Sequence, residues 1–258
     1  MLNLKAILII TAIFSFGIPL AFAYEAIPIT YSGTKDHVQF DGKWTFEYEW
    51  KESSLNQYSY ENGNELVILR SAHQGNFVYI LLDIVSDESL DVGLDKAIVC
   101  FDTKSDKNII ADSDDFCFMA VLGQSTGTTY QGDHTLNSQN SYKEIPNYDG
   151  FIGIGASSDE NDRYSGIPHA TYEFKIPTDL IGRSSVYGFN FAVFDETTKK
   201  FYTYPDDITT NNGFSSPADW GEIYSPDKSL PEFYLVPLVM VLAIVPVVLV
   251  TRIKKLTL

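Results

Sequence analysis

The chain has 258 residues and a formal net charge of −16 at pH 7, from 34 acidic against 18 basic residues. A chain this acidic repels phosphate backbones, which excludes nucleic acid as an expected partner. The acidity serves either solubility or the binding of divalent cations.

The first 23 residues are typical of a secretory signal peptide. Lys5 precedes an apolar run from Ala6 to Phe16, and Ala21-Phe22-Ala23 matches a small-x-small cleavage site. We therefore expect export, with residues 24–230 forming one domain outside the cell.

Strand-like segments fill 24–230. Trp44, Phe46, Tyr48 and Trp50 alternate with polar residues, which is the period of a strand with one aromatic face. Apolar segments of strand length follow at 65–71, 77–85, 96–103, 116–122, 151–156, 170–176, 187–195 and 201–204. Only 177–182, with Pro first and Gly last, predicts a helical turn. The pattern predicts an all-β fold, an antiparallel β-sandwich with jelly-roll or immunoglobulin-like connections.

Both cysteines of the chain, Cys100 and Cys117, lie in the expected extracellular domain. An oxidising compartment permits a disulfide, and the short stretch between the two residues fits neighbouring strands. The alternative is a pair of buried thiols. Zinc is not expected, because His73 and His134 lack a zinc-like spacing to the cysteines.

Oxygen donors crowd the connection between two predicted strands. They are Asp102, Asp106, Asn108, Asp112 and Asp114. Calcium takes about six to eight oxygen ligands, which a flexible acidic loop can supply. A solvated loop is the simpler alternative, since EF-hand spacing is absent. A second acidic run, 83–95, precedes the intervening strand, so we expect the two runs not to share one ion.

Several segments resemble carbohydrate-binding module family 9. They are Phe40-Asp41-Gly42-Lys43-Trp44, the strand-like 77–83 and 98–102, the turn 176–182 and the strand-like 187–195. The likeness spans about 36–224 and extends to DOMON-related domains, some of which bind sugar and others haem. It implies a β-sandwich that stacks sugar on aromatic side chains, with polar groups at the rim.

The resemblance makes three tryptophans candidate ligand-binding residues. Trp44 and Trp50 share the face of one predicted strand and equally suit a core, whereas Trp220 has loop-like neighbours. For haem, Met119 is the candidate axial ligand. Packing in a buried strand explains this methionine as well, so we expect no haem.

Metalloprotease and phosphate-loop motifs are absent from the sequence. It contains no His-Glu-x-x-His and no Gly-rich phosphate loop, and its four histidines are scattered. We therefore expect no catalytic residues and no enzymatic activity.

The segment 231–258 is typical of a membrane anchor. The uncharged run 233–250 would rise ~27 Å as a helix, close to the thickness of a hydrocarbon core. Arg252, Lys254 and Lys255 follow, which predicts a cytoplasmic C-terminus. Pro231-Glu232-Phe233 ahead of this run resembles the PEF-CTERM sorting signal of archaeal surface proteins. That resemblance implies an archaeosortase partner, which would remove the helix.

The sequence thus predicts a cell-surface anchored, non-catalytic module that binds glycans or other envelope components. The alternatives are a haem-binding redox module of the DOMON-related type and a structural envelope protein without a small ligand.

Overall fold

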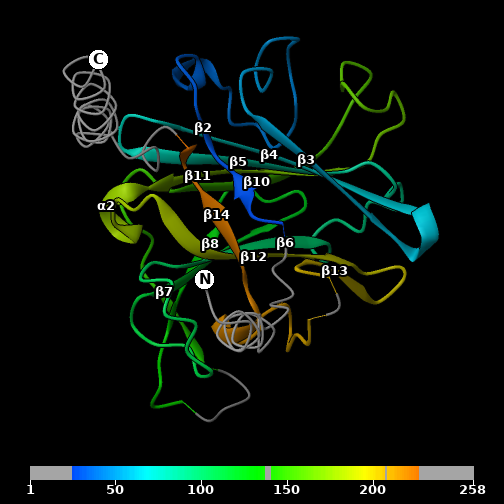
Figure 1. The fold of residues 1–258 in the computed structure, drawn as a ribbon. Coiled ribbons are helices and arrows are strands. Elements are labelled where there is room, and N and C mark those ends of the chain that lie inside the picture. Colours follow the sequence, from blue (N-terminus) through cyan, green and yellow to red (C-terminus); the bar gives the residue numbers. More distant parts are fainter. Residues whose placement is uncertain (1–24, 137–140, 207, 227–258) are drawn as a thin grey trace, which may run out of the picture.

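Two β-sheets face each other in the computed structural model, which describes residues 25–136, 141–206 and 208–226 (Figure 1). The predicted signal peptide, 1–23, and the predicted anchor, 231–258, lie outside the described residues. Within the described ranges, no helix has the length and hydrophobicity needed to cross a membrane.

The strands divide into a large and a small sheet. Within the described residues the large sheet has eight strands in the order β1-β14-β12-β6-β7-β8-β9, with β13 also paired to β12. Its strands are β1 (Ile27–Pro28), β6 (Lys96–Asp102), β7 (Asp115–Val121), β8 (Thr128–Gly132), β9 (Tyr142–Ile145), β12 (Val186–Asp195), β13 (Lys200–Tyr204) and β14 (Gly221–Tyr224).

The small sheet has six strands in the described residues, in the order β10-β11-β5-β4-β2, with β3 also paired to β4. They are β2 (Thr30–Tyr31), β3 (Ser54–Tyr60), β4 (Glu65–Gln74), β5 (Phe77–Ile84), β10 (Ile152–Ser157) and β11 (Ala170–Pro177). The described helices are short: η1 (Lys35–His37), η2 (Glu61–Gly63), α2 (Thr178–Ile181) and η3 (Pro217–Asp219). These two layers confirm the predicted β-sandwich.

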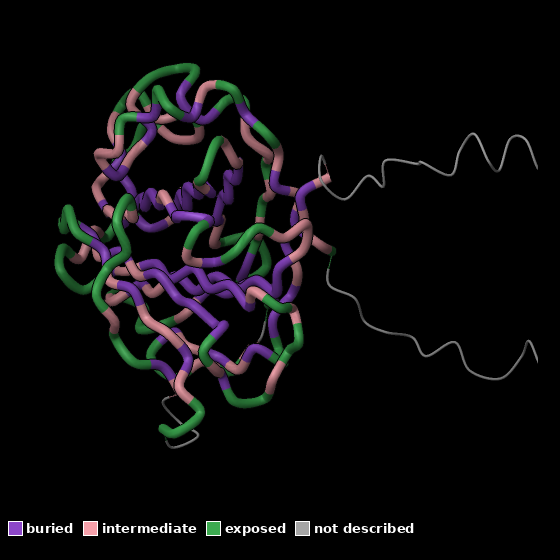
Figure 2. Tube along the Cα trace, turned by 90° about the vertical axis from the view of Figure 1, so that its left-hand side faces the viewer, coloured by how far each residue is buried: buried purple, intermediate pink, exposed green. Residues whose placement is uncertain are grey.

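Alternating side chains build the core between the sheets. In β6, Val99 and Phe101 point inward, and in β5, Ile80 and Leu82 meet them from the other sheet. Each is completely buried, as expected for strands whose period of two places every second residue on one face. Figure 2 shows the buried residues along the strands and the exposed ones in the loops around them.

Both sheets are also covered on their outer faces. On the large sheet, Ile98, Cys100, Cys117, Trp220 and their neighbours form a second apolar cluster, here called the disulfide cluster. On the small sheet, Val38, Trp44, Trp50, Tyr79 and Leu81 form a third, the tryptophan cluster. An apolar cluster therefore covers the outer face of each sheet, so that strands beneath it are buried on both of their faces.

The predicted strand over Trp44–Trp50 is wrong. These residues form turns, in which the Glu49 amide donates to the Phe46 carbonyl at 3.1 Å. The Glu49 carboxylate accepts from the backbone amides of Thr45, at 2.7 Å, and Gln39, at 2.8 Å. A side chain that binds nearby backbone in this way competes with strand pairing. The alternation of aromatic residues is typical of a strand, but here the chain forms turns that cover the outer face of the small sheet.

One ladder joins the two ends of the described domain. β1 runs parallel to β14, with Ile27 opposite Ile223, and the Ile29 amide donates to the Tyr224 carbonyl at 2.7 Å. Ile27 and Ile29 are 1% and 2% exposed, so the first strand of the domain closes one edge of the core.

Candidate functional site

The predicted disulfide is confirmed. Cys100 and Cys117 lie directly opposite each other on β6 and β7, and their sulfurs are bonded. Both residues are fully buried on the outer face of the large sheet. A loop of this length is expected to gain about 3 kcal/mol of stability from the cross-link in the chain-entropy model.

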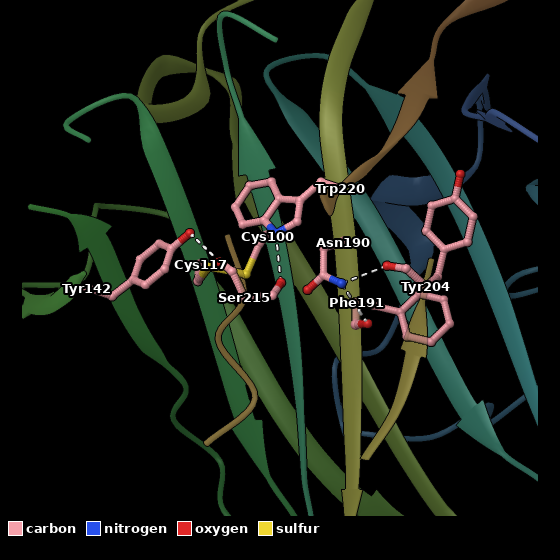
Figure 3. The surroundings of a disulfide bond; sticks show 8 residues. All are labelled: Cys100, Cys117, Tyr142, Asn190, Phe191, Tyr204, Ser215 and Trp220. Atoms are coloured by element: carbon pink, nitrogen blue, oxygen red, sulfur yellow. Dashed lines mark hydrogen bonds between the residues drawn. A yellow bond between two sulfur atoms is a disulfide. The ribbon is translucent and has the colours of Figure 1, made fainter. Parts of the chain in front are cut away.

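Trp220 lies over this disulfide and not in an open groove. Its indole is 1% exposed, and its Nε1–H donates to the Ser215 hydroxyl oxygen at 2.8 Å (Figure 3). On the same face, the Tyr142 hydroxyl donates to the Ser215 carbonyl at 3.3 Å. Trp220 therefore supports the segment around Ser215 from below and has no free face for a ligand.

That segment forms one wall of a pocket of about 400 Å³, here called the outer pocket. Its lining residues are Ile109, Ala111, Ser141, Tyr142, Thr209, Thr210, Asn211, Phe214, Ser215 and Ser216. The lining combines aromatic rings with hydroxyl and amide groups, and among the described residues it includes no acidic or basic side chain. A neutral, hydroxyl-rich ligand matches this chemistry.

The Phe214 ring is held in place from two sides. It stacks on Tyr142 with ring centroids 5.1 Å apart and meets the edge of Tyr130 at 4.9 Å. Backbone hydrogen bonds in both directions tie Asn211 to Phe214. The turn between them needs Gly213, whose φ is +92° and whose missing Cβ would lie 2.6 Å from Ile98. The ring is therefore preorganised at the pocket wall.

Sequence reasoning missed Phe214. The signal that was available is the run Asn211-Asn212-Gly213-Phe214-Ser215-Ser216, an aromatic residue inside a polar turn. Such a residue has no strand to be buried in, which marks it as a candidate for ligand contact.

Trp44 and Trp50 are both structural. They are 1% and 0% exposed in the tryptophan cluster. The Trp44 Nε1–H donates to the Phe46 carbonyl at 2.6 Å, and the Trp50 Nε1–H donates to the Glu173 carboxylate at 2.9 Å. Burial strongly raises the pKa of Glu173, which favours a protonated carboxyl beneath the indoles. Neither tryptophan can stack on a ligand from this position.

The acidic loop 102–115 brings some of its predicted calcium ligands together. Carboxylate oxygens of Asp102, Asp106 and Asp114 lie within 4.8 Å of one another. One buried oxygen of Asp114 has no hydrogen-bond partner in the part of the chain that the structure describes. Asn108 and Asp112 instead bind each other at 3.1 Å. The predicted set therefore divides into a convergent trio and a separate pair.

A second carboxylate trio was not predicted as a unit. Asp87 and Asp95, before β6, meet Asp195 at the end of β12, again within 4.8 Å and with all three residues buried. Their hydrogen-bond donors are backbone amides and hydroxyl groups, and no described basic side chain forms an ion pair with them. Burial, and then the charge of Asp87, raises the pKa of Asp95 to about 7.

Two polar atoms at this second trio lack hydrogen-bond partners within the described ranges. They are Oδ2 of Asp87 and the hydroxyl of Tyr172, both buried. Burial, and then the charges of Asp95, Asp87 and Asp195, raises the pKa of Tyr172, so its hydroxyl lies within electrostatic range of the trio. Unpartnered buried oxygens around three like charges are the arrangement that a divalent cation would complete.

Met119, the residue considered for haem, lies on β7. It is partly buried and packs against the disulfide cluster. Packing therefore accounts for its position.

Ser158, His169 and Asp83 resemble a catalytic triad in connectivity only. His169 lies 2.9 Å from the Ser158 hydroxyl through Nδ1 and 2.6 Å from Asp83 through Nε2. However, Nδ1 also lies 2.7 Å from the Ile167 carbonyl oxygen, which can only accept. Nδ1 therefore carries a hydrogen and cannot take the serine proton, and the group is fully buried. The arrangement is a structural ion pair, completed by Asp162 at 3.8 Å.

This ion pair predicts a pH dependence of stability. Burial lowers the pKa of His169, but the hydrogen bond and charge of Asp83 outweigh it and raise the pKa above the ordinary value. Because the folded-state pKa of His169 is raised, its protonation stabilises the fold below about pH 6.5. This stabilisation is lost as the pH rises through the folded-state pKa. Asp83, with a pKa raised by burial to about 6, acts in the same direction at lower pH.

We therefore expect His169→Gln to flatten the fall in melting temperature between pH 6 and pH 9, although the variant is less stable overall. Thermal melts across this range measure the slope. His134→Gln, which changes an exposed histidine, is the matched control and should keep the wild-type slope. A wild-type slope in the His169 variant would contradict the assignment.

Comparison with known proteins identifies structures with a similar fold but no protein with a matching sequence. No protein-family model matches the sequence, and no curated protein matches it. A family 9 carbohydrate-binding module from Caldicellulosiruptor kristjanssonii, solved in complex with glucose, superimposes with a TM-score of 0.50 at 16% identity. The match covers 78% of this chain and 95% of that one. A structure of such a module from the same organism with cellotriose gives a TM-score of 0.47 at 14% identity, covering 80% and 98%.

The domain therefore has the fold of a family 9 carbohydrate-binding module, as the sequence resemblance predicted.

Proposed function

We propose that the domain is a non-catalytic glycan-binding module and that its ligand occupies the outer pocket. The observation that carries the proposal is the lining of this pocket: a fixed aromatic ring, Phe214, surrounded by uncharged hydroxyl and amide groups. A sugar ring offers apolar C–H faces to such a ring and hydroxyl groups to such a rim. The glucose complex of a module with the same fold supports the choice of ligand class.

The charge of the protein narrows the class of glycan that the domain is expected to bind. At −16, the chain repels anionic polymers, so a neutral glycan is favoured over a sulfated or uronic one. Charged groups are also absent from the described lining of the pocket, so no cation in its wall offsets this repulsion.

We expect Phe214→Ala to weaken glycan affinity by about tenfold, the loss that removal of one stacking contact produces. Calorimetric titration of the wild type and the variant with glucose and cellotriose measures the change. Tyr148→Ala removes an exposed aromatic residue elsewhere and should leave the affinity unchanged. Equal affinities of wild type and Phe214→Ala would refute the pocket assignment. If no glycan of a broad array binds the wild type, a structural envelope protein becomes the better explanation.

We propose in addition that the domain is displayed outside the cell. The supporting features are the signal-like residues 1–23 and the anchor-like residues 231–258, whose resemblance to a PEF-CTERM signal suggests processing by an archaeosortase. Protease added to intact cells should degrade the domain. Survival of the domain until the cells are lysed would contradict display.

The two carboxylate trios support a third proposal, that the domain binds calcium. One trio is Asp87, Asp95 and Asp195, and the other is Asp102, Asp106 and Asp114. In each trio a buried carboxylate oxygen has no hydrogen-bond partner among the described residues. A cation at these positions would serve stability and would take no direct part in glycan contact, since none of the six residues lines the outer pocket.

A further inference from the structure

Two aromatic side chains are exposed on the face of the molecule opposite the outer pocket. Phe46 is 39% exposed and Tyr48 is 61% exposed. They belong to the segment that covers the outer face of the small sheet, drawn in blue in Figure 1. Together with Thr34, His37, Glu49, Lys51 and Glu52 they line a hollow of about 480 Å³, here called the second platform.

The second platform is rigid. The Trp44 indole holds the Phe46 carbonyl at 2.6 Å, and the Lys51 amide donates to the Tyr48 carbonyl at 3.3 Å. Beneath them, the buried ammonium group of Lys35 donates to the Glu49 carbonyl at 2.6 Å. The two rings are therefore presented on a scaffold that loses little entropy when a ligand binds.

Core packing does not account for the two rings. Trp44 and Trp50 already fill the space over the small sheet and are almost completely buried. Within the described residues, the one ring contact of Tyr48 is the ammonium of Lys51, 4.8 Å from its centroid. Apolar surface kept in water at a fixed position is typical of a binding site.

The surroundings of the rings select the class of ligand. Glu52, His37 and Lys51 offer both acceptors and donors beside the apolar hollow, which suits a ligand with hydroxyl groups. A lipid surface is disfavoured, because the exposed carboxylates of Asp36, Glu47 and Glu52 would have to be desolvated. A protein partner is also disfavoured, because a hollow lined by seven residues offers much less surface than the ~800 Å² per partner of a standard protein interface.

We propose that the second platform is a second glycan-binding site, with sugar rings stacked on Phe46 and Tyr48. This inference rests on the proposed glycan-binding function and adds a site on the opposite sheet to the outer pocket. Two sites on opposite faces allow one domain to bridge two glycan chains. They also allow it to hold one polymer with the added strength of a bivalent contact.

Titration of the full chain with cellotriose tests the proposal through its stoichiometry. We expect two sites per wild-type chain and one site for the Phe46→Ala/Tyr48→Ala double variant. The single variant Phe214→Ala should retain the binding at the second platform. Tyr48→Phe keeps the ring and serves as the matched control, with two sites expected. Melting temperatures of all variants identify any that fail to fold. If the double variant does not fold, Phe46→Ser replaces it in the titration.

The outcomes separate the two proposals. If the double variant binds like the wild type while Phe214→Ala loses its binding, the second site is refuted and the outer pocket stands. If the double variant abolishes binding while Phe214→Ala has no effect, the platform is supported and the outer pocket is refuted. If neither cellotriose nor xylo- or manno-oligosaccharides bind the wild type, both proposals are overturned.

Discussion

Replacing Trp220 with alanine is expected to destabilise the domain by about 3 to 5 kcal/mol, the usual cost of removing a large buried aromatic side chain. The indole is 1% exposed, lies in the disulfide cluster and donates a hydrogen bond to Ser215. Its removal leaves a cavity over the disulfide and an unpaired hydroxyl on the pocket wall. Urea unfolding followed by circular dichroism measures the loss.

Phe214→Ala is the partner experiment, because Phe214 is only partly buried and lines the outer pocket. We expect this variant to lose little stability and most of its glycan affinity, whereas Trp220→Ala loses mainly stability. The reverse pattern, a stable Trp220→Ala variant with weakened binding, would mean that the indole itself contacts the sugar.

Removal of calcium is expected to lower the melting temperature strongly. At free calcium about 1,000-fold above the dissociation constant, binding contributes ~4 kcal/mol, which for a domain of this size corresponds to roughly 8 to 16 °C. The physical reason is the trio of Asp87, Asp95 and Asp195, whose like charges are buried together without a described basic partner. Melting curves in millimolar calcium and in chelator measure the difference.

Asp87→Asn gives the sharper version of this experiment. Its unpartnered oxygen becomes an amide that can donate to the other two carboxylates, so the calcium-free variant should melt above the calcium-free wild type. The same change removes a ligand, so most of the response to calcium should disappear. Asp106→Asn tests the other trio, and Asp149→Asn, at an exposed acid outside both, is the control. An unchanged calcium response in both trio variants would exclude the proposed sites.

The sequence predicted the sandwich well where apolar residues alternate. The strands from β4 to β7 and from β10 to β13 agree with the predicted segments to within a few residues. Strands β1, β2, β3, β8, β9 and β14 were missed, because each is either very short or rich in polar residues and lacks a continuous apolar segment. The disulfide was predicted from the short stretch between the two cysteines, because residues on consecutive strands can lie opposite each other when the hairpin register pairs them.

The candidate sites were harder to predict, for a physical reason. Phe214 acquires its role only because the segment before β14 passes over β8 and β9, a contact between distant parts of the chain. Asp195 reaches Asp87 and Asp95 in the same way, through the pairing of β12 with β6. Conversely, the tryptophans attracted attention as large aromatic residues, and the fold uses all three as packing. Local patterns predict strands, whereas binding sites depend on which strands become neighbours.

The ladder between β1 and β14 restricts where the proposed leader peptide could be removed. A cut after Ala23 leaves only three residues ahead of Ile27, so the mature chain keeps the strand that seals this edge. Trimming a few positions further in would take Ile27 and Ile29 away and uncover Ile223 to water. In the proposed export, the position of the cleavage site and the closure of the fold would therefore depend on the same few residues.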